Sequence, residues 1–346
     1  MKNKITITDV ASAAGVSKTT VSRYLNNRND LMSEKTRARI EKVIKLLDYR
    51  PSELARSLKS KRTHTIGVLI SDIYSPFFSA VITGVQEEAA KKGYTVFFMN
   101  SENNIDIENN NISELLSRDI EGLIINTSKK DNDYIASLDI NKVPIVLCDR
   151  YITNHSLDIV TIDNEMMYNV LFDHLVEQGY NRFGLFIEPW EQNSTRQSRR
   201  DNFIRIIKKR FGYDATRDVY TIGTDYKTYE DALKSFSVTF GLQDVPVAIG
   251  GNTIATFSIY QAIKKSKYDI PKDIGVCGPD DWNWNNDMSW SEIASAPITT
   301  LEFDAKELGK KCTEILINKI HNIDKKAEEI KLPVNIKVRN STIRKD

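Results

Sequence analysis

Two groups of residues in this chain have side chains suited to recognition chemistry, and they lie in different parts of the sequence. Near the N-terminus, Lys18, Thr19 and Arg23 stand within one short segment, KTTVSRYL. Lysine and arginine donate hydrogen bonds to guanine or phosphate, and threonine offers a hydroxyl and a methyl group to base edges. Further along, carboxylate, amide and guanidinium side chains follow successive apolar runs, which is a mixture suited to holding a polyhydroxy or acidic small molecule.

The N-terminal group requires a helix that carries it into a groove of DNA. Thr6 can cap a first helix whose third position is Asp9, and Gly15 ends that helix. Ser17 can cap a second helix only two residues later. Two short helices joined by a tight turn form a helix-turn-helix, in which the N-terminal residues of the second helix reach base edges in the major groove.

A third helix completes this small unit. After Ser33, apolar residues recur at helical spacing at Ile40, Val43, Ile44 and Leu47, a face that closes a three-helix core. The helix is expected to end at Arg50-Pro51, since the residue before proline is disfavoured in the helical region. We therefore predict an all-α DNA-binding domain over residues 1–50.

The distribution of charge agrees with this prediction. The whole chain of 346 residues has a net charge of +1, but residues 1–62 hold 15 Lys and Arg against 6 Asp and Glu, and the remainder holds 33 against 41. A basic segment on an acidic body is typical of proteins that contact nucleic acid. On its own, a basic helical hairpin could equally be a solvated surface.

The motif is more specific than the charge. The stretch TITDVASAAGVSKTTVSRYL, with LeuAsnAsn, SerGluLysThrArg and TyrArgPro after it, closely resembles the DNA-binding head of the LacI/GalR family of bacterial transcriptional regulators. Ser17 and Ser22 are placed to reach phosphates. The predicted DNA contacts in this unit are Thr6, Ser17, Lys18, Thr19, Thr20, Ser22, Arg23 and Asn26.

Residues 51–62 are predicted to form a hinge. SerGluLeuAlaArgSerLeuLys is a helix of about two turns, too short to persist alone in water. The resemblance implies that it folds when two copies pair on operator DNA, with Leu58 inserted into the minor groove, Ala55 at the close contact and Lys59 near phosphate. The alternative is a plain linker in which Leu58 packs on its own body.

Residues 63–346 show short β-branched runs alternating with amphipathic segments, and the pattern restarts after about residue 163. This alternation predicts two doubly wound lobes with parallel sheets. We assign the first lobe to about 63–162 and 296–323, and the second to about 163–295 and 324–346. The body resembles the periplasmic-binding-protein-like core of the same family, which implies a ligand-sensing role.

Ligands of such sheets bind beyond the carboxyl ends of the strands. The resemblance implies that Pro76, Phe77 and Phe78 form an aromatic wall, that Arg199 anchors the ligand, and that Asp149, Asn252 and Asp280 bind it. Trp282 is a further candidate, because an indole beside a pocket can stack on a sugar ring, and the alternative is a core or interface indole. Because guanidinium pairs bidentately with carboxylate, Arg199 suggests a carboxylated sugar. The alternative is that these residues are helix caps and surface charges.

Three positions depart from the family pattern. Asn202 stands where a glycine is usual, Thr253 where an aspartate is usual and Pro279 where an apolar aromatic is common. These departures concern the fine shape of the pocket. AspAspTrpAsnTrp is similar to the ketodeoxygluconate-repressor-like subgroup.

The implied function is a DNA-binding transcriptional regulator, a repressor of carbohydrate utilisation genes controlled by a sugar or sugar-acid effector. Its implied partners are palindromic double-stranded operator DNA, the effector and a second copy of the chain in a homodimer. The sequence leaves open the effector, the operator, the regulated genes, any protein corepressor, a dimer or a tetramer, and an inducing or corepressing response.

Two other classes of function were weighed. A solute-binding protein of sugar transport shares the two-lobed body but should begin with a secretory signal. An enzyme could use Asp280 and Asp281 as acid and base, but adjacent side chains seldom face one reacting atom, and the histidines show no metal or triad spacing. We expect no catalytic residue, cofactor or metal.

The cellular setting is expected to be the cytoplasm. Cys148, Cys277 and Cys312 lie far apart among apolar residues, as buried free thiols do in a reducing compartment. No apolar run approaches the length of a membrane span, and the polar N-terminus lacks the apolar stretch of a secretory signal.

Overall fold

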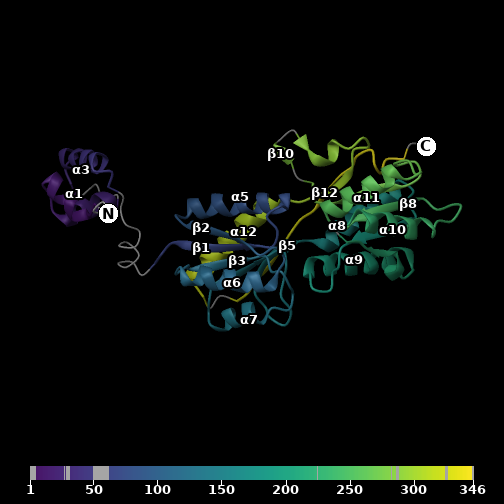
Figure 1. The fold of residues 1–346 in the computed structure, drawn as a ribbon, viewed down its shortest axis with the longest axis horizontal. Helices are drawn as coiled ribbons and strands as arrows, with labels where there is room; N and C mark the ends of the chain where they lie inside the picture. Colours follow the sequence, from purple (N-terminus) through teal and green to yellow (C-terminus); the bar gives the residue numbers. More distant parts are fainter. Residues whose placement is uncertain are drawn as a thin grey trace. The chain divides into compact units, whose positions relative to one another are not determined.

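The structure is a computed structural model of the chain. It describes residues 5–26, 28, 32–49, 62–223, 225–281, 283–285, 288–323 and 326–344, with the backbone alone for 283–285 and 288. The chain divides into two compact units, Met1–Thr63 and His64–Asp346, which we call the head and the core. Figure 1 shows the helices of the head and the two α/β lobes of the core.

The head consists of α1 (Ile7–Ala14), α2 (Lys18–Leu25) and α3 (Glu34–Leu46). The expected caps are present: the Thr6 side chain accepts from the Asp9 N–H and the Asp9 carboxylate accepts from the Thr6 N–H, which makes a capping box. The buried side chains are Val10, Ala11, Ala14, Val21 and Ile40, with Val43, Ile44 and Leu47 packed around them. The predicted three-helix core is confirmed.

The first lobe of the core contains a parallel six-stranded sheet in the order β13-β5-β4-β3-β1-β2. Helices α5 and α12 cover one face, and α6 and α7 cover the other (Figure 1). Its elements are β1 (Thr65–Ile70), α5 (Pro76–Lys91), β2 (Thr95–Asn100), α6 (Ile105–Ser117), β3 (Gly122–Ile125), α7 (Asp133–Ile140), β4 (Ile145–Cys148), β5 (Asp158–Ile162), α12 (Ala305–His321) and β13 (Glu329–Leu332).

The α5–α12 pair is packed backbone to backbone. A Cβ atom added at Gly84 would lie 1.9 Å from the Lys306 carbonyl oxygen, and one added at Gly309 would lie 2.1 Å from the Val81 carbonyl oxygen. Only glycine permits this approach, and it joins α12 to a helix more than 200 positions earlier in the chain. The first lobe therefore depends on segments from both ends of the core.

The second lobe contains a six-stranded sheet in the order β14-β12-β9-β8-β6-β7, parallel except for the β12–β14 pair. Helices α8 and α9 pack on one face, and α10 and α11 on the other. Its elements are α8 (Asn164–Glu177), β6 (Arg182–Ile187), α9 (Ser194–Phe211), η2 (Ala215–Asp218), β7 (Val219–Thr221), α10 (Tyr226–Ser237), β8 (Pro246–Gly250), α11 (Thr253–Lys265), β9 (Gly275–Pro279), β10 (Asn283–Asn285), β11 (Met288–Ser289), η3 (Trp290–Glu292), β12 (Thr299–Glu302) and β14 (Asn335–Lys337).

The later lobe boundaries differ from the sequence prediction. We assigned 296–323 to the first lobe and 324–346 to the second. Strand β12 instead pairs with β9 in the second lobe, and β13 pairs with β5 in the first. The chain therefore changes lobes after Glu302 and again after Leu332. The error has a physical cause, since hydrophobic periodicity identifies a strand but not the distant strand with which it pairs.

The fold class is as expected: an all-α helix-turn-helix head and a periplasmic-binding-protein-like core of two doubly wound lobes. Within the described ranges, no helix combines the length and apolarity needed to cross a membrane.

Candidate functional site

The head presents the N-terminal end of α2 to solvent. Gly15 adopts a left-handed conformation with φ 59°, which ends α1, and Ser17 begins α2 by accepting the Thr20 N–H at 3.1 Å. Val21 is buried against α1 and α3, so the opposite side of α2 faces outward. This is the local geometry that the sequence predicted.

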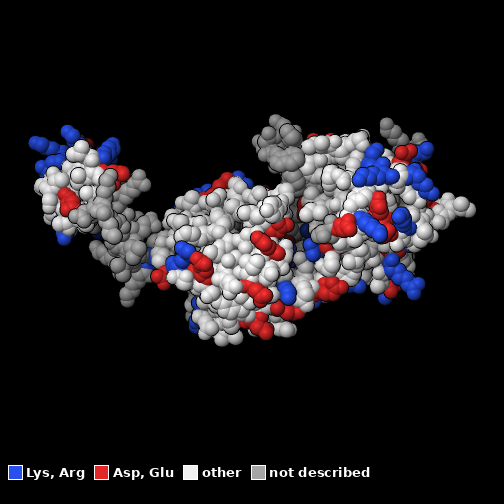
Figure 2. Space-filling view, viewed as in Figure 1, with Lys and Arg blue, Asp and Glu red and all other residues white. Residues whose placement is uncertain are grey.

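The cations on this side of α2 have free donor groups. Lys18, Thr19 and Arg23 are exposed. Among the residues that the structure describes, neither the Lys18 ammonium nor the Arg23 guanidinium has a hydrogen bond or ion pair. Figure 2 shows Lys and Arg side chains gathered on the head. Such groups can exchange bound water and counterions for phosphate oxygens or base edges.

The other predicted DNA contacts in the head form local hydrogen bonds. The hydroxyls of Ser17 and Thr20 lie 2.9 Å apart, and the Asn26 side-chain amide donates to the Ser22 carbonyl oxygen at 2.8 Å. Thr6 belongs to the capping box described above. These bonds set the conformation of both ends of α2 and the start of α1. The hinge residues Ala55, Leu58 and Lys59 lie outside the described residues.

The core contains a cleft at the carboxyl ends of strands from both lobes. A cavity of about 730 Å³ is lined by residues that follow β1 and β4 in the first lobe and β6, β8 and β9 in the second. A smaller cavity of about 100 Å³ adjoins it and shares Phe78, Arg150, Arg196, Asn252 and Asp280 with it. The first cavity lies within the usual size range of small-molecule sites.

Arg199 lines the small cavity and already has several partners within the protein. Its Nη1 donates to the Gly251 carbonyl oxygen at 2.6 Å, its Nε donates to Asn164 Oδ1 at 3.2 Å, and its Nη2 lies 3.7 Å from Asp280 Oδ1. The residue is only 5% exposed. Arg199 therefore holds the second-lobe strand ends in position, and its capacity for a ligand carboxylate is smaller than we expected.

The two predicted ligand aspartates flank this arginine. Asp149 and Asp280 both have positive φ, 66° and 73°, at the points where β4 and β9 end. Asp149 Oδ2 accepts from Thr195 Oγ1 at 3.1 Å, and burial raises the pKa of the Asp149 carboxyl although Arg199 and Arg150 oppose that rise. Both carboxylates line the small cavity and can accept hydrogen bonds from ligand hydroxyls.

Asn252, which was predicted to bind the ligand, already has hydrogen-bond partners within the protein. Its Oδ1 caps α11 by accepting the Ala255 N–H at 2.8 Å, and its Nδ2 donates to both Glu188 oxygens at 2.9 and 3.1 Å. Glu188 also pairs with Arg196 at 3.2 Å. The amide lines the cleft, but its polar atoms position Glu188 and Arg196.

The three residues of the predicted aromatic wall all line one or both of these cavities. Phe78 lines both cavities, Pro76 lines the larger one and Phe77 lines the smaller one, edge-on to Phe78. Trp282 lies outside the described residues. Sequence reasoning missed Phe257 and Trp290, which line the second-lobe side of the large cavity. The Trp290 indole N–H donates to the Asp280 carbonyl oxygen at 3.0 Å.

Two of the departures from the family pattern have a structural account. The Thr253 hydroxyl donates to Asp280 Oδ2 at 3.2 Å, where an aspartate would bring a second carboxylate against the first. Asn202 donates to the Ser198 carbonyl oxygen at 2.8 Å and lies outside the cleft. Pro279 is buried as the last residue of β9, and nothing in the structure explains its choice.

Asp281 points away from its neighbour Asp280. Its Oδ1 accepts from Ser289 and Ser291, and its Oδ2 lies 2.9 Å from Arg339 and 3.2 Å from Lys337. These hydrogen bonds and cations lower the pKa of the Asp281 carboxyl despite its burial. The pair Asp280 and Asp281 therefore does not form an acid and base directed at one substrate atom.

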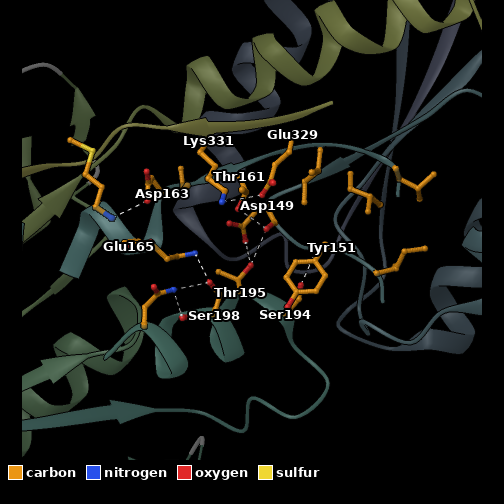
Figure 3. Close-up of a pocket in the computed structure, with 18 of the residues that line it drawn as sticks. Asp149, Tyr151, Thr161, Asp163, Glu165, Ser194, Thr195, Ser198, Glu329 and Lys331 are labelled. Carbon is orange, nitrogen blue, oxygen red and sulfur yellow. Dashed lines mark hydrogen bonds and ion pairs between the residues drawn. The ribbon is translucent and has the colours of Figure 1, made fainter. Parts of the chain in front are cut away.

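A third cavity is lined by the loop after β4, the first turns of α8 and α9, and β13. Its volume is about 820 Å³, and Asp149 and Thr195, which line it (Figure 3), also line the small cavity of about 100 Å³. Other charged groups that line it have partners within the protein: Asp163 caps α8, Glu165 pairs with Arg205 and Glu329 pairs with Lys331. Among the described residues, no cluster of three or more His, Cys, Asp or Glu could hold a metal ion.

The lobes contact each other through the first turn of α9. The Ser194 hydroxyl accepts from the Tyr151 N–H at 2.9 Å, and Lys130 Nζ donates to Gln197 Oε1 at 2.8 Å. With the Thr195–Asp149 hydrogen bond, these contacts join the second lobe to the loops after β3 and β4. A change in the angle between the lobes would have to alter them.

Comparison with known proteins covers both units. Residues 6–52 match the description "Bacterial regulatory proteins, lacI family", and residues 63–341 match "Periplasmic binding proteins and sugar binding domain of LacI family". The HTH-type transcriptional regulator PtxS of Pseudomonas putida is 32% identical over 342 residues, 99% of this chain and 97% of that protein. The HTH-type transcriptional regulator KdgR of Bacillus subtilis is 29% identical over 336 residues, 97% of each chain.

Solved structures agree on the fold. The lac repressor dimer bound to operator and the anti-inducer ONPF has a TM-score of 0.83 at 21% identity, covering 99% of this chain and 100% of that one. The complex of the transcriptional regulator CelR with cellobiose has a TM-score of 0.68 at 22% identity, covering 97% and 99%. These matches extend over both the head and the core.

Proposed function

Because the chain belongs to the LacI family of bacterial regulatory proteins, we propose that it represses carbohydrate utilisation genes by binding operator DNA and releasing or tightening its hold when a small molecule enters the core. Like the other members of its family, it is a DNA-binding transcription regulator and not an enzyme. The observation that carries the proposal is the exposed side of α2, on which Lys18 in the first turn and Arg23 in the last turn have no partner within the described residues.

In the proposed complex α2 lies in the major groove. Lys18, Thr19 and Arg23 face base edges, while Thr6, Ser17, Thr20, Ser22 and Asn26 lie near the sugar-phosphate backbone. A homodimer would place two heads on a palindromic operator, since two-fold protein symmetry matches two-fold DNA symmetry. The related lac repressor is described as a dimer bound to operator.

The hinge is proposed to couple the two units. Ala55, Leu58 and Lys59 would order on DNA, with Leu58 as a wedge in the minor groove. Leu58→Ala should weaken specific binding while leaving ligand binding by the core intact. Unchanged operator affinity in a filter-binding titration would remove the wedge from the account.

The effector is proposed to bind in the cleft of about 730 Å³ and to change the angle between the lobes. Pro76, Phe77, Phe78, Asp149, Arg199, Asn252, Asp280 and Trp282 are its proposed contacts or supports. The carboxylates favour a polyhydroxy ligand, and relatives include the ribose operon repressor of Escherichia coli and the CelR–cellobiose complex. A sugar or sugar acid fits this mixture of groups.

The proposed place of action is the cytoplasm, where the DNA is. Cys148, Cys277 and Cys312 are buried free thiols, as expected for a reducing compartment. A solute-binding protein of sugar transport shares the core, but the match of residues 6–52 to bacterial regulatory proteins favours the regulatory role.

The proposal is tested by selection of DNA in the absence of any effector. Sheared genomic fragments are incubated with the full chain, and the bound fragments are sequenced. We expect a small set of fragments sharing an inverted repeat, and expect a Lys18→Ala, Arg23→Ala double variant to lose the enrichment. Equal recovery of all fragments, or enrichment unchanged in the double variant, would contradict DNA recognition by α2.

A further inference from the structure

Lys130, in the loop after β3, contacts the second lobe through both its main chain and its side chain. Its N–H donates to the Gln192 carbonyl oxygen at 2.9 Å, and its Nζ donates to Gln197 Oε1 at 2.8 Å. Its carbonyl oxygen accepts from the Thr153 N–H at 2.7 Å, in the loop after β4 of its own lobe. Lys130 therefore connects two loops of the first lobe to the start of α9 in the second.

Two further hydrogen bonds join the lobes at the same turn of α9. The Tyr151 N–H donates to Ser194 Oγ at 2.9 Å, and Thr195 Oγ1 donates to Asp149 Oδ2 at 3.1 Å (Figure 3). A rotation that separates the first turn of α9 from the loops after β3 and β4 therefore breaks several hydrogen bonds together. The contacts of Lys130 belong to this group, so they stabilise the present angle between the lobes.

A buried carboxylate holds the loop that carries Lys130. Glu108 on α6 is 0% exposed, and its carboxylate accepts from Thr127 Oγ1 at 2.9 Å, from Asn132 Nδ2 at 2.7 Å and from the Ser128 N–H. No Lys or Arg of the described segments forms an ion pair with it. Because a buried carboxylate without hydrogen-bond donors is costly, these three bonds fix the conformation of the loop on both sides of Lys130.

We propose that Lys130 is a positioning residue that holds the two lobes at the angle of this structure, and that Glu108 places Lys130 for this contact. The inference rests on the proposed function, in which the effector changes that angle. Neither side chain lines either cavity of the cleft, so both act on an effector only through the arrangement of the lobes. A ligand that favours another angle must break the Lys130 contacts, and its affinity is lower by that cost.

Amide hydrogen exchange of the full chain, without DNA or ligand, measures how often the lobes separate. Lys130→Met removes the bond to Gln197 and should accelerate exchange of the Tyr151 N–H about 3-fold to 10-fold, the factor expected for one such hydrogen bond. Tyr151 keeps its own partner in this variant, so faster exchange there reports separation of the lobes. Exchange in β3 and β8, which lie inside the two sheets, should stay the same.

Lys129 provides the matched control. It is the neighbouring residue, it is exposed, and its ammonium has no hydrogen bond or ion pair among the residues described. Lys129→Met removes the same charge and should leave exchange at Tyr151 unchanged. Unchanged exchange in Lys130→Met, or an equal acceleration in Lys129→Met, would overturn the proposal.

A double-mutant cycle tests the pair itself. Gln197→Leu removes the acceptor and should accelerate exchange at Tyr151 as much as Lys130→Met does, and the double variant should show no further increase. Two factors that multiply in the double variant would mean that Lys130 and Gln197 act independently, which contradicts the assigned contact.

The role of Glu108 has its own variant. Glu108→Gln keeps the size of the side chain but turns one acceptor oxygen into a donor, so it should accelerate exchange at both Lys130 and Tyr151. Glu114→Gln on the exposed side of the same helix is the control and should change neither. If Glu108→Gln accelerates exchange in β3 as much as at Lys130, Glu108 supports the whole lobe and does not specifically place Lys130.

Ligand affinity gives the functional readout. D-ribose, cellobiose and D-gluconate are titrated calorimetrically into the wild-type chain and into Lys130→Met. A compound that binds the wild-type chain should bind the variant about 3-fold to 10-fold more tightly, because it no longer has to break the bond to Gln197. Equal or weaker binding would overturn the proposal. The exchange measurements contain neither DNA nor ligand, so they distinguish a failure of this contact from a failure of the proposed function.

Discussion

The head and the cleft of the core use the same residue types under opposite conditions. On α2 the Lys18 and Arg23 side chains are exposed and unpaired among the described residues, whereas in the cleft Arg196 and Arg199 are held by Glu188 and Asp280. Free surface cations suit a partner that is a long polyanion and exchanges counterions. Held cations suit a small ligand that must find its contacts already in place.

Replacement of Arg199 should produce the largest loss in the free energy of unfolding. It tests whether the contacts of Arg199 hold the cleft residues in place. Arg199→Met leaves Asp280 buried without its cation and the Gly251 carbonyl oxygen without its donor, which costs about 3 to 5 kcal/mol for a buried pair. Urea unfolding of the core measures this loss. Effector binding should also disappear.

Arg205→Met on the same helix is the matched control. Its ion pair with Glu165 is exposed on both sides and should contribute no more than about 1 kcal/mol. Equal unfolding curves for the two variants would mean that the Arg199 contacts carry no particular weight.

The Asp281→Asn substitution should produce the next largest loss in the free energy of unfolding, and this loss should depend on pH. The folded pKa of Asp281 is lowered, so its contribution to stability is present above the unfolded pKa and is lost as the pH falls through the folded pKa. Asp281→Asn should cost about 2 kcal/mol near pH 7, the range for hydrogen bonds to charged groups, and progressively less below about pH 4. Unfolding free energies measured from pH 3 to pH 7 test this.

The exposed Asp231→Asn, which removes a pair with Lys234, should leave the same pH profile unchanged. A constant difference between the wild-type chain and Asp281→Asn at every pH would contradict the titration assigned to Asp281.

Substitution of Lys18 tests the role of the exposed cations on the head. Lys18→Ala should weaken operator binding by about 1 to 3 kcal/mol and leave effector affinity unchanged, because its exposed side chain serves DNA alone. Fluorescence anisotropy with the selected operator measures the change. Lys42→Ala on α3 is an exposed control outside α2, and an equal loss in that variant would indicate a general charge effect.

The smallest expected effect is a change in how steeply operator affinity depends on salt concentration. The logarithm of operator affinity should fall linearly with the logarithm of salt concentration, and Arg23→Ala should reduce that slope by about one if Arg23 contacts a phosphate. Effector binding in the cleft should respond much less, since its charges are partly buried. Similar slopes for the two reactions would remove the distinction between free and held cations.

Local features of the fold could be predicted because they depend on neighbouring residues. The caps at Thr6 and Ser17, the end of α1 at Gly15 and the buried face at Ile40 each follow from side chains within a few positions. The two parallel sheets also follow from a repeated alternation. The positions of β12 and β13 did not, because their pairing partners lie far away in the sequence.

In the candidate site, too, features set by neighbouring residues could be predicted and contacts between distant residues could not. Asp149, Asn252 and Asp280 follow the ends of β4, β8 and β9, whereas Arg199 lies within α9. The partners of these four side chains were not predictable. Arg199 bonds to the Gly251 carbonyl oxygen and Asn252 turns toward Glu188, and both contacts require the finished sheet. Phe257 on α11 was missed because helix periodicity does not tell which face meets a cleft, and Trp290 in η3 was missed because it lies outside any periodic segment.

The most direct test of the account is a titration of the operator complex of the full chain with the sugar or sugar acid that most raises the melting temperature of the protein. If the core controls the head, saturating ligand should change operator affinity about 5-fold to 150-fold in one direction, the usual range of coupling between two sites. Operator affinity that stays the same while calorimetry shows the core fully occupied would contradict the account.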